Sequence, residues 1–132
     1  MSAAIYLVTE KEVLGLPVID GKPLSNALDD LDALAQTLNL ELLSDFIHIT
    51  NNELEDALGN AGVDLMDFMI PETQWFEAEN LLETVFALRV HLEKHPASMQ
   101  NSSLALSDLR ALELALELCE AKEVRVRLTI DI

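Results

Sequence analysis

The last nine residues of the chain alternate between apolar and polar side chains. The apolar members are Val124, Val126, Leu128, Ile130 and Ile132. A period of two is typical of a β-strand with one buried face, because successive side chains of a strand point to opposite sides. Residues 4–9, near the other end of the chain, are apolar and partly β-branched and also predict a strand. An isolated strand leaves its backbone N–H and C=O groups unpaired, so we expect the two strands to pair.

Between these strands the apolar residues recur at helical spacing. The predicted helices cover residues 25–39, 52–58, 64–69, 77–95 and 104–122. Ser25 is the expected N-cap of the first helix, and Pro96 ends the fourth. Residues 46–50 form a short buried segment that is a candidate third strand. The predicted fold class is α+β: a mostly helical single domain, residues 1–132, in which four to five helices pack on a small sheet that includes both terminal strands.

The two longest predicted helices are apolar on more than one side. Helix 77–95 has one stripe at Leu81, Val85, Leu88 and Leu92 and a second at Leu82, Phe86 and Val90. Helix 104–122 has core positions at Leu109, Leu112, Leu116 and Cys119 and a further strip at Leu106, Leu114 and Leu118. So wide an apolar face suits a helix that is either central in the core or in contact with another molecule. We therefore expect self-association as a symmetric dimer, through Leu82, Phe86 and Val90 or through Leu114 and Leu118.

The charge of the chain restricts its partners. There are 24 acidic and 8 basic side chains, which give a formal net charge of −16. A field of this sign repels nucleic-acid phosphates and anionic lipid surfaces, so neither nucleic acid nor membrane is an expected partner. A basic protein is favoured instead, because complementary charge accelerates encounter and rejects like-charged competitors. An antitoxin or immunity protein directed against a basic nuclease would fit this pattern.

Four residues are candidates for an interaction site. They are Trp75, Phe86, Asp29 and Asp30. Trp75 either anchors an interface or covers the start of the following helix. Asp29 and Asp30 lie on an acidic face of the first helix. The function predicted from these features is a small, acidic protein-interaction module.

Few residues suggest catalysis, a cofactor or a metal. His91 and His95 are four apart on one predicted helix and are the candidate metal ligands, although no Glu follows the first His as in zinc proteases. The alternative function is a small-ligand or metal-binding protein, or an enzyme, with a pocket near His48, His91, His95 and Arg127. The sequence has no glycine-rich phosphate loop, paired cysteines or serine-nucleophile turn, so we expect no cofactor and favour a non-enzymatic function.

The lone Cys119 lies within an apolar helical series and is expected to pack in the core. It excludes an internal disulfide. The N-terminal apolar patch lacks preceding basic residues and is followed by acidic ones, which is not the pattern of a signal peptide. The cytoplasm is therefore the expected compartment.

Several segments together resemble a group of small bacterial proteins of unassigned function. The segments are residues 43–47 (Leu-Ser-Asp-Phe-Ile), residues 74–76 (Gln-Trp-Phe), residues 83–88 (Glu-Thr-Val-Phe-Ala-Leu), residues 106–117 and the closing run Val-Arg-Val-Arg-Leu-Thr-Ile-Asp-Ile. The resemblance extends from about Leu28 to the end of the chain. It implies a bacterial, cytoplasmic origin and assigns no activity to any residue.

Overall fold

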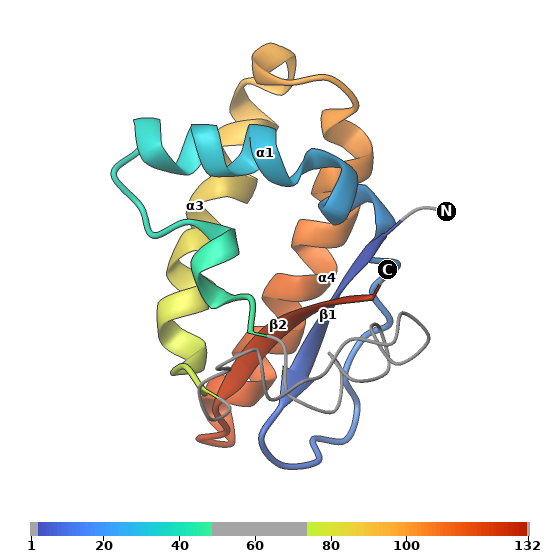
Figure 1. The fold of residues 1–132 in the computed structure, drawn as a ribbon, viewed down its shortest axis with the longest axis vertical. Coiled ribbons are helices and arrows are strands. Elements are labelled where there is room, and N and C mark those ends of the chain that lie inside the picture. The colour runs from blue at the N-terminus through green and yellow to red at the C-terminus, as the bar shows by residue number, and fades with distance from the viewer. Residues whose placement is uncertain (1–2, 49–73, 132) are drawn as a thin grey trace, which may run out of the picture.

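The two predicted strands pair in the computed structural model, which describes residues 3–48 and 74–131. Strands β1 (Ala4–Thr9) and β2 (Val126–Asp131) are antiparallel, in a register that runs from Ala4 opposite Asp131 to Thr9 opposite Val126. The two ends of the described chain therefore lie beside each other (Figure 1). The expectation that the strands pair is confirmed.

Strand β2 has neighbours on both edges. On the side away from β1, Ile47 forms an isolated parallel bridge to Leu128, and Phe76 forms an antiparallel bridge to Val126. The candidate third strand over residues 46–50 is not a strand where it is described. Phe46 ends the short 3-10 helix η1 (Leu43–Phe46), and a single bridge follows at Ile47.

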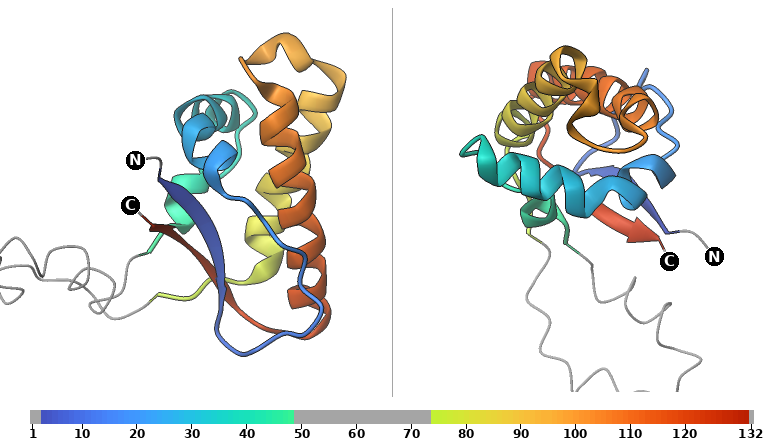
Figure 2. Two further views of the ribbon diagram at one scale, coloured as in Figure 1. Left: turned by 90° about the vertical axis from the view of Figure 1, so that its right-hand side faces the viewer. Right: turned by 90° about the horizontal axis from the view of Figure 1, so that it is seen from above.

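Within the described residues, three α-helices pack against this sheet and against each other. They are α1 (Lys22–Thr37), α3 (Ala78–Lys94) and α4 (Ser102–Ala121), with the 3-10 turn η4 (Pro96–Ser98) between the last two. Helices α3 and α4 form an antiparallel hairpin on one side of the molecule, the sheet lies on the other side, and α1 crosses near one end (Figures 1 and 2). The stripes predicted as core are buried: Leu81, Val85, Leu88 and Leu92 on α3, and Leu109, Leu112, Leu116 and Cys119 on α4. None of the described helices is long and apolar enough to cross a membrane.

The predicted number of four to five helices is wrong, because the described residues contain three α-helices. These three are the long segments whose apolar stripes are buried against the sheet and one another. The short helices predicted at residues 52–58 and 64–69 lie outside the described residues. The broader prediction, a mostly helical α+β fold, agrees with the structure.

The start of the first helix also differs from the prediction. Helix α1 begins at Lys22, and its N-cap is Gly21 rather than Ser25. The capping acceptor comes from α4: the Asp108 carboxylate accepts hydrogen bonds from the backbone N–H groups of Gly21 and Leu24, at 3.1 and 3.2 Å. Because a carboxylate from a distant helix satisfies these donors, α1 starts one turn earlier than its own polar side chains indicate.

Gly21 also joins α1 to the sheet. Its φ is +83°, and a Cβ there would lie 2.3 Å from the Ile5 carbonyl oxygen. The Ile5 N–H donates to the Gly21 carbonyl at 3.0 Å. Only glycine combines this backbone conformation with so close an approach of β1.

Candidate functional site

The outward face of the α3–α4 hairpin carries two of the large apolar residues that are exposed; others, Leu14, Val18 and Leu104, are exposed elsewhere on the molecule. Phe86 on α3 is 50% exposed and Leu114 on α4 is 56% exposed, whereas Leu82 and Leu118 are half-buried beside them. Phe86 and Leu114 of the second apolar stripes therefore reach the surface, whereas Leu82 packs against the core. Val90 is half-buried and Leu106 is buried, so the exposed part of these stripes is confined to one stretch of each helix.

This face is hollowed in two places. One hollow of about 290 Å³ is lined by Glu79, Leu82, Glu83, Phe86, Glu113 and Glu117. A second of about 400 Å³ is lined by Gly15, Pro17, Leu114, Glu117 and Leu118. Because Glu117 lines both, we treat the two hollows as one surface and call it the α3–α4 groove. Its lining combines apolar side chains with polar residues that are all glutamates.

A guanidinium group lies at the edge of the groove. Arg89 donates from Nε and Nη2 to the Glu113 carboxylate and from Nη1 to Glu93, and its Cζ lies 5.2 Å from the centroid of the Phe86 ring. The bonds to Glu113 and then to Glu93 raise the pKa of Arg89. Arg110 also binds Glu93, at 3.1 Å, and with Arg89 it holds the pKa of Glu93 below its usual range. The Arg89–Glu113 and Arg110–Glu93 ion pairs connect α3 to α4.

The other three glutamates of the groove have no cationic partner among the described residues. The Lys and Arg residues of the chain are Lys11, Lys22, Arg89, Lys94, Arg110, Lys122, Arg125 and Arg127, and all of them are described. Their ion pairs reach Glu10, Glu93 and Glu113, but not Glu79, Glu83 or Glu117. The groove therefore combines exposed apolar side chains with uncompensated negative charge.

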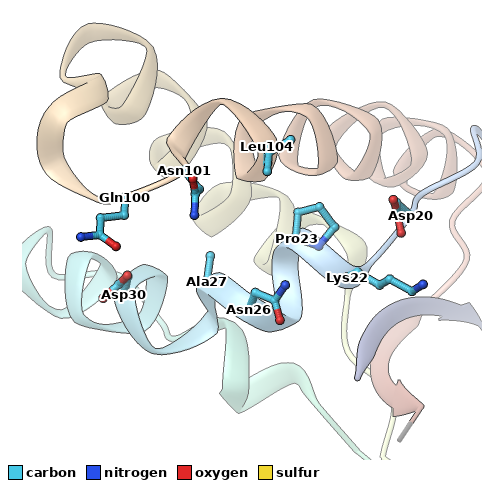
Figure 3. Close-up of a pocket in the computed structure, with 9 residues that line it drawn as sticks. All are labelled: Asp20, Lys22, Pro23, Asn26, Ala27, Asp30, Gln100, Asn101 and Leu104. Atoms are coloured by element: carbon cyan, nitrogen blue, oxygen red, sulfur yellow. The ribbon is translucent and has the colours of Figure 1, made fainter. Parts of the chain in front are cut away.

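A different hollow, of about 370 Å³, lies between α1 and the start of α4 (Figure 3). Its polar lining residues are Asp20, Lys22, Asn26, Asp30, Gln100 and Asn101. Asn101 is the N-cap of α4 but makes no side-chain capping bond, and its amide points toward α1. The predicted interaction residue Asp30 lies at one end of this hollow, and its neighbour Asp29 is exposed on α1.

Of the four residues of the predicted pocket, the structure brings His48 and Arg127 together but places His91 and His95 at the other end of α3. His91 and His95 lie in the last turn and C-cap of α3, with ring centroids 4.9 Å apart, and the Ser98 hydroxyl lies 3.3 Å from Nε2 of His91. His48 lies beside β2, near the start of α3, so roughly 20 Å of helix separates it from His91. Within residues 3–48 and 74–131, no three His, Cys, Asp or Glu side chains are grouped to hold a metal ion.

Arg127 differs most from its predicted environment. The alternation of the last strand placed it on a polar face, whereas it is only 4% exposed. Its guanidinium lies 5.4 Å from the centroid of the Trp75 ring and donates to the backbone oxygen of His48. The segments that bridge to the free edge of β2 cover this side chain, so both faces of the first half of β2 are buried.

Trp75, a predicted interaction residue, is half-buried against Arg127 before the start of α3. Cys119 is fully buried, as predicted, and burial raises the pKa of its thiol. A buried thiol with a raised pKa has little thiolate character and is a poor nucleophile.

The chain matches no protein family, no curated protein and no solved structure.

The residues that sequence reasoning missed are the glutamates of the groove. Glu79 and Glu83 are four apart on α3, and Glu113 and Glu117 are four apart on α4. This spacing places each pair on one side of its helix, next to an exposed apolar stripe. The spacing was visible in the sequence, but only the packing of the hairpin shows that the two pairs face one groove.

Proposed function

We propose that this protein is an acidic protein-interaction module whose α3–α4 groove binds a basic segment of a partner protein. The observation that supports this most strongly is the surface around Phe86. A half-exposed aromatic ring lies among Glu79, Glu83 and Glu117, which no Lys or Arg of the chain neutralises. Apolar area supplies affinity when it is buried, and complementary charge supplies encounter rate and specificity. An antitoxin- or immunity-like protein that neutralises a basic nuclease belongs to this class.

Self-association through the same groove is the second candidate. It is favoured by the exposure of Phe86 and Leu114, which a symmetric dimer would cover. Against it, a two-fold contact would bring Glu79, Glu83 and Glu117 of one copy near those of the other. Bringing like charges together in an interface that excludes water raises the free energy of binding by roughly several kcal/mol. A basic partner removes this cost, so we place it first.

The test is affinity capture from a bacterial lysate with the tagged protein, washed at about 50 mM and about 500 mM NaCl and read by mass spectrometry. We expect a basic protein in stoichiometric amount at the low salt concentration and its loss at the high one. A variant with Glu79→Lys and Glu83→Lys reverses the charge of one wall of the groove and should lose the same partner at low salt.

The matched control is a variant with Asp29→Lys and Asp30→Lys, which makes the same charge change on α1. It should retain the partner. If this variant loses the partner and the groove variant keeps it, the proposed site is wrong and the binding surface is on α1. Recovery of the protein without any partner, at the mass of a dimer in sedimentation, would favour self-association instead.

A further inference from the structure

The hollow beside Phe86 has the features of an arginine site. We infer that the basic partner segment is an amphipathic helix that places an arginine side chain in the 290 Å³ hollow lined by Glu79, Leu82, Glu83, Phe86, Glu113 and Glu117. This inference rests on the proposed function and specifies the chemistry of the partner. Three observations support it: a guanidinium that the chain itself places here, the unpaired carboxylates, and the helical walls of the groove.

The guanidinium of Arg89 shows how this site holds such a group. It lies 5.2 Å from the centroid of the Phe86 ring and binds the Glu113 carboxylate through two nitrogens. A ring that carries a guanidinium together with a bidentate carboxylate is a favourable combination for arginine. Because Phe86 remains 50% exposed, Arg89 leaves much of the ring open toward the hollow.

Three carboxylates that line this hollow have no Lys or Arg partner in the chain. Glu79 and Glu83 lie on the α3 wall and Glu117 on the α4 wall. Glu79 and Glu83 line the same hollow as the Phe86 ring and the paired Glu113. A second guanidinium from outside the chain would pair with these carboxylates.

The walls of the groove explain why the occupant is helical. The 290 Å³ hollow is lined only by residues of α3 and α4, whose backbone N–H and C=O groups are already bonded within each helix. An extended segment laid on such a surface would leave its own backbone groups unpaired, whereas a helix satisfies them internally. Apolar residues of that helix, one turn apart, would contact Leu82 on one side of Glu117 and Leu114 and Leu118 on the other.

Arginine suits the hollow better than lysine for a physical reason. The planar guanidinium stacks on an aromatic ring and binds a carboxylate through two N–H groups at once, whereas the lysine ammonium is a compact, strongly hydrated charge. Lysine would still be attracted to the glutamates, but it would gain less from Phe86. The negative charge of the groove favours a basic partner. The Phe86 ring favours arginine over lysine within that partner.

The experiment compares three synthetic helical peptides that share one apolar stripe and carry arginine, lysine or citrulline at the same positions. Binding to the full chain is measured by isothermal titration calorimetry. We expect the arginine peptide to bind about fivefold more tightly than the lysine peptide, and the neutral citrulline peptide to bind least. In the Phe86→Leu variant, which keeps an apolar side chain but removes the ring, the preference for arginine should disappear.

Two matched variants separate the site from the overall charge. Glu79→Gln with Glu83→Gln should weaken the arginine peptide strongly, and Asp29→Asn with Asp30→Asn, the same charge change on α1, should not. Equal binding of the arginine and lysine peptides would overturn the arginine inference and leave the basic-partner proposal standing. Binding by none of the peptides would also overturn it, and the capture experiment would then decide the wider proposal separately.

Discussion

Asp108 links three elements of the fold through one carboxylate. It lies on α4, is 4% exposed, and accepts hydrogen bonds from the N–H groups of Gly21 and Leu24 at the start of α1. Gly21 in turn bonds to Ile5 of β1. Burial is the largest influence on this carboxyl group and raises its pKa, although the two backbone N–H groups oppose the change.

The raised pKa predicts a pH dependence of stability. The native state holds the Asp108 proton more tightly than the unfolded chain does, so the contribution of this group is complete below the ordinary carboxyl pKa. It is lost as the pH rises through the raised, folded-state pKa. In Asp108→Asn the amide oxygen still accepts both N–H bonds but carries no charge. We therefore expect the unfolding free energy of this variant, relative to the original protein, to increase as the pH rises above the ordinary carboxyl pKa and through the raised pKa of Asp108.

Urea unfolding at a series of pH values measures this difference. Asp108→Ala is the companion variant: it leaves two buried N–H groups without an acceptor and should cost roughly 2 to 5 kcal/mol. A relative stability of Asp108→Asn that did not change with pH would contradict the prediction.

At the scale of elements, the partly buried ion pair between Arg89 on α3 and Glu113 on α4 is expected to stabilise the hairpin. The side chains of Arg89 and Glu113 are 19% and 11% exposed, so removing one leaves the other poorly solvated. Arg89→Met keeps the apolar stem but leaves the Glu113 carboxylate without its cationic partner. We expect a loss of about 2 to 3 kcal/mol in unfolding free energy. The double variant Arg89→Met, Glu113→Leu should recover much of that loss, because no unpaired charge remains.

The control for this prediction is Arg110→Met on the same hairpin. Arg110 is 57% exposed and binds only Glu93, so its removal should change stability by about 0.5 kcal/mol or less. Chemical denaturation of the original protein, Arg89→Met, Glu113→Leu and the double variant gives the coupling energy. Strictly additive effects of the two substitutions would show that Arg89 and Glu113 do not act as a pair.

At the scale of the whole molecule, the net charge of −16 opposes compaction. All four arginines are engaged within the chain, and the exposed surface keeps most of the carboxylates. We expect the melting temperature to rise by a few degrees between about 10 mM and about 150 mM NaCl, because salt screens the mutual repulsion of these groups.

Scanning calorimetry at several salt concentrations checks this expectation. A variant in which Asp29, Asp30, Glu79 and Glu83 are replaced by the corresponding amides should respond less to salt, because it carries four fewer charges. A melting temperature that fell with added salt in the original protein would mean that the ion pairs outweigh the repulsion.

Local periodicity was enough to predict the main elements of this fold. The alternation of Val124 to Ile132 and the run from Ala4 to Thr9 predicted two strands, and both observed strands lie within two residues of these bounds. The stripes that contain Leu88 and Leu112 predicted the buried faces of α3 and α4. These features follow from neighbouring residues, because the period of a strand or a helix is set by the backbone geometry of the segment itself.

Contacts between distant segments decided the rest. Asp108 caps α1 across 87 and 84 residues of sequence, to Gly21 and Leu24, and no pattern near Gly21 shows it. Arg127 alternates like a solvent-facing residue but is buried, because Trp75 and His48 meet it from elsewhere in the chain. The groove exists only because the hairpin turns Glu79 and Glu83 toward Glu117. The sequence by itself determined the three long helices, the two terminal strands and the stripes of α3 and α4 that are buried. Tertiary packing decided which polar side chains contact each other, because these contacts depend on how whole helices and strands are placed.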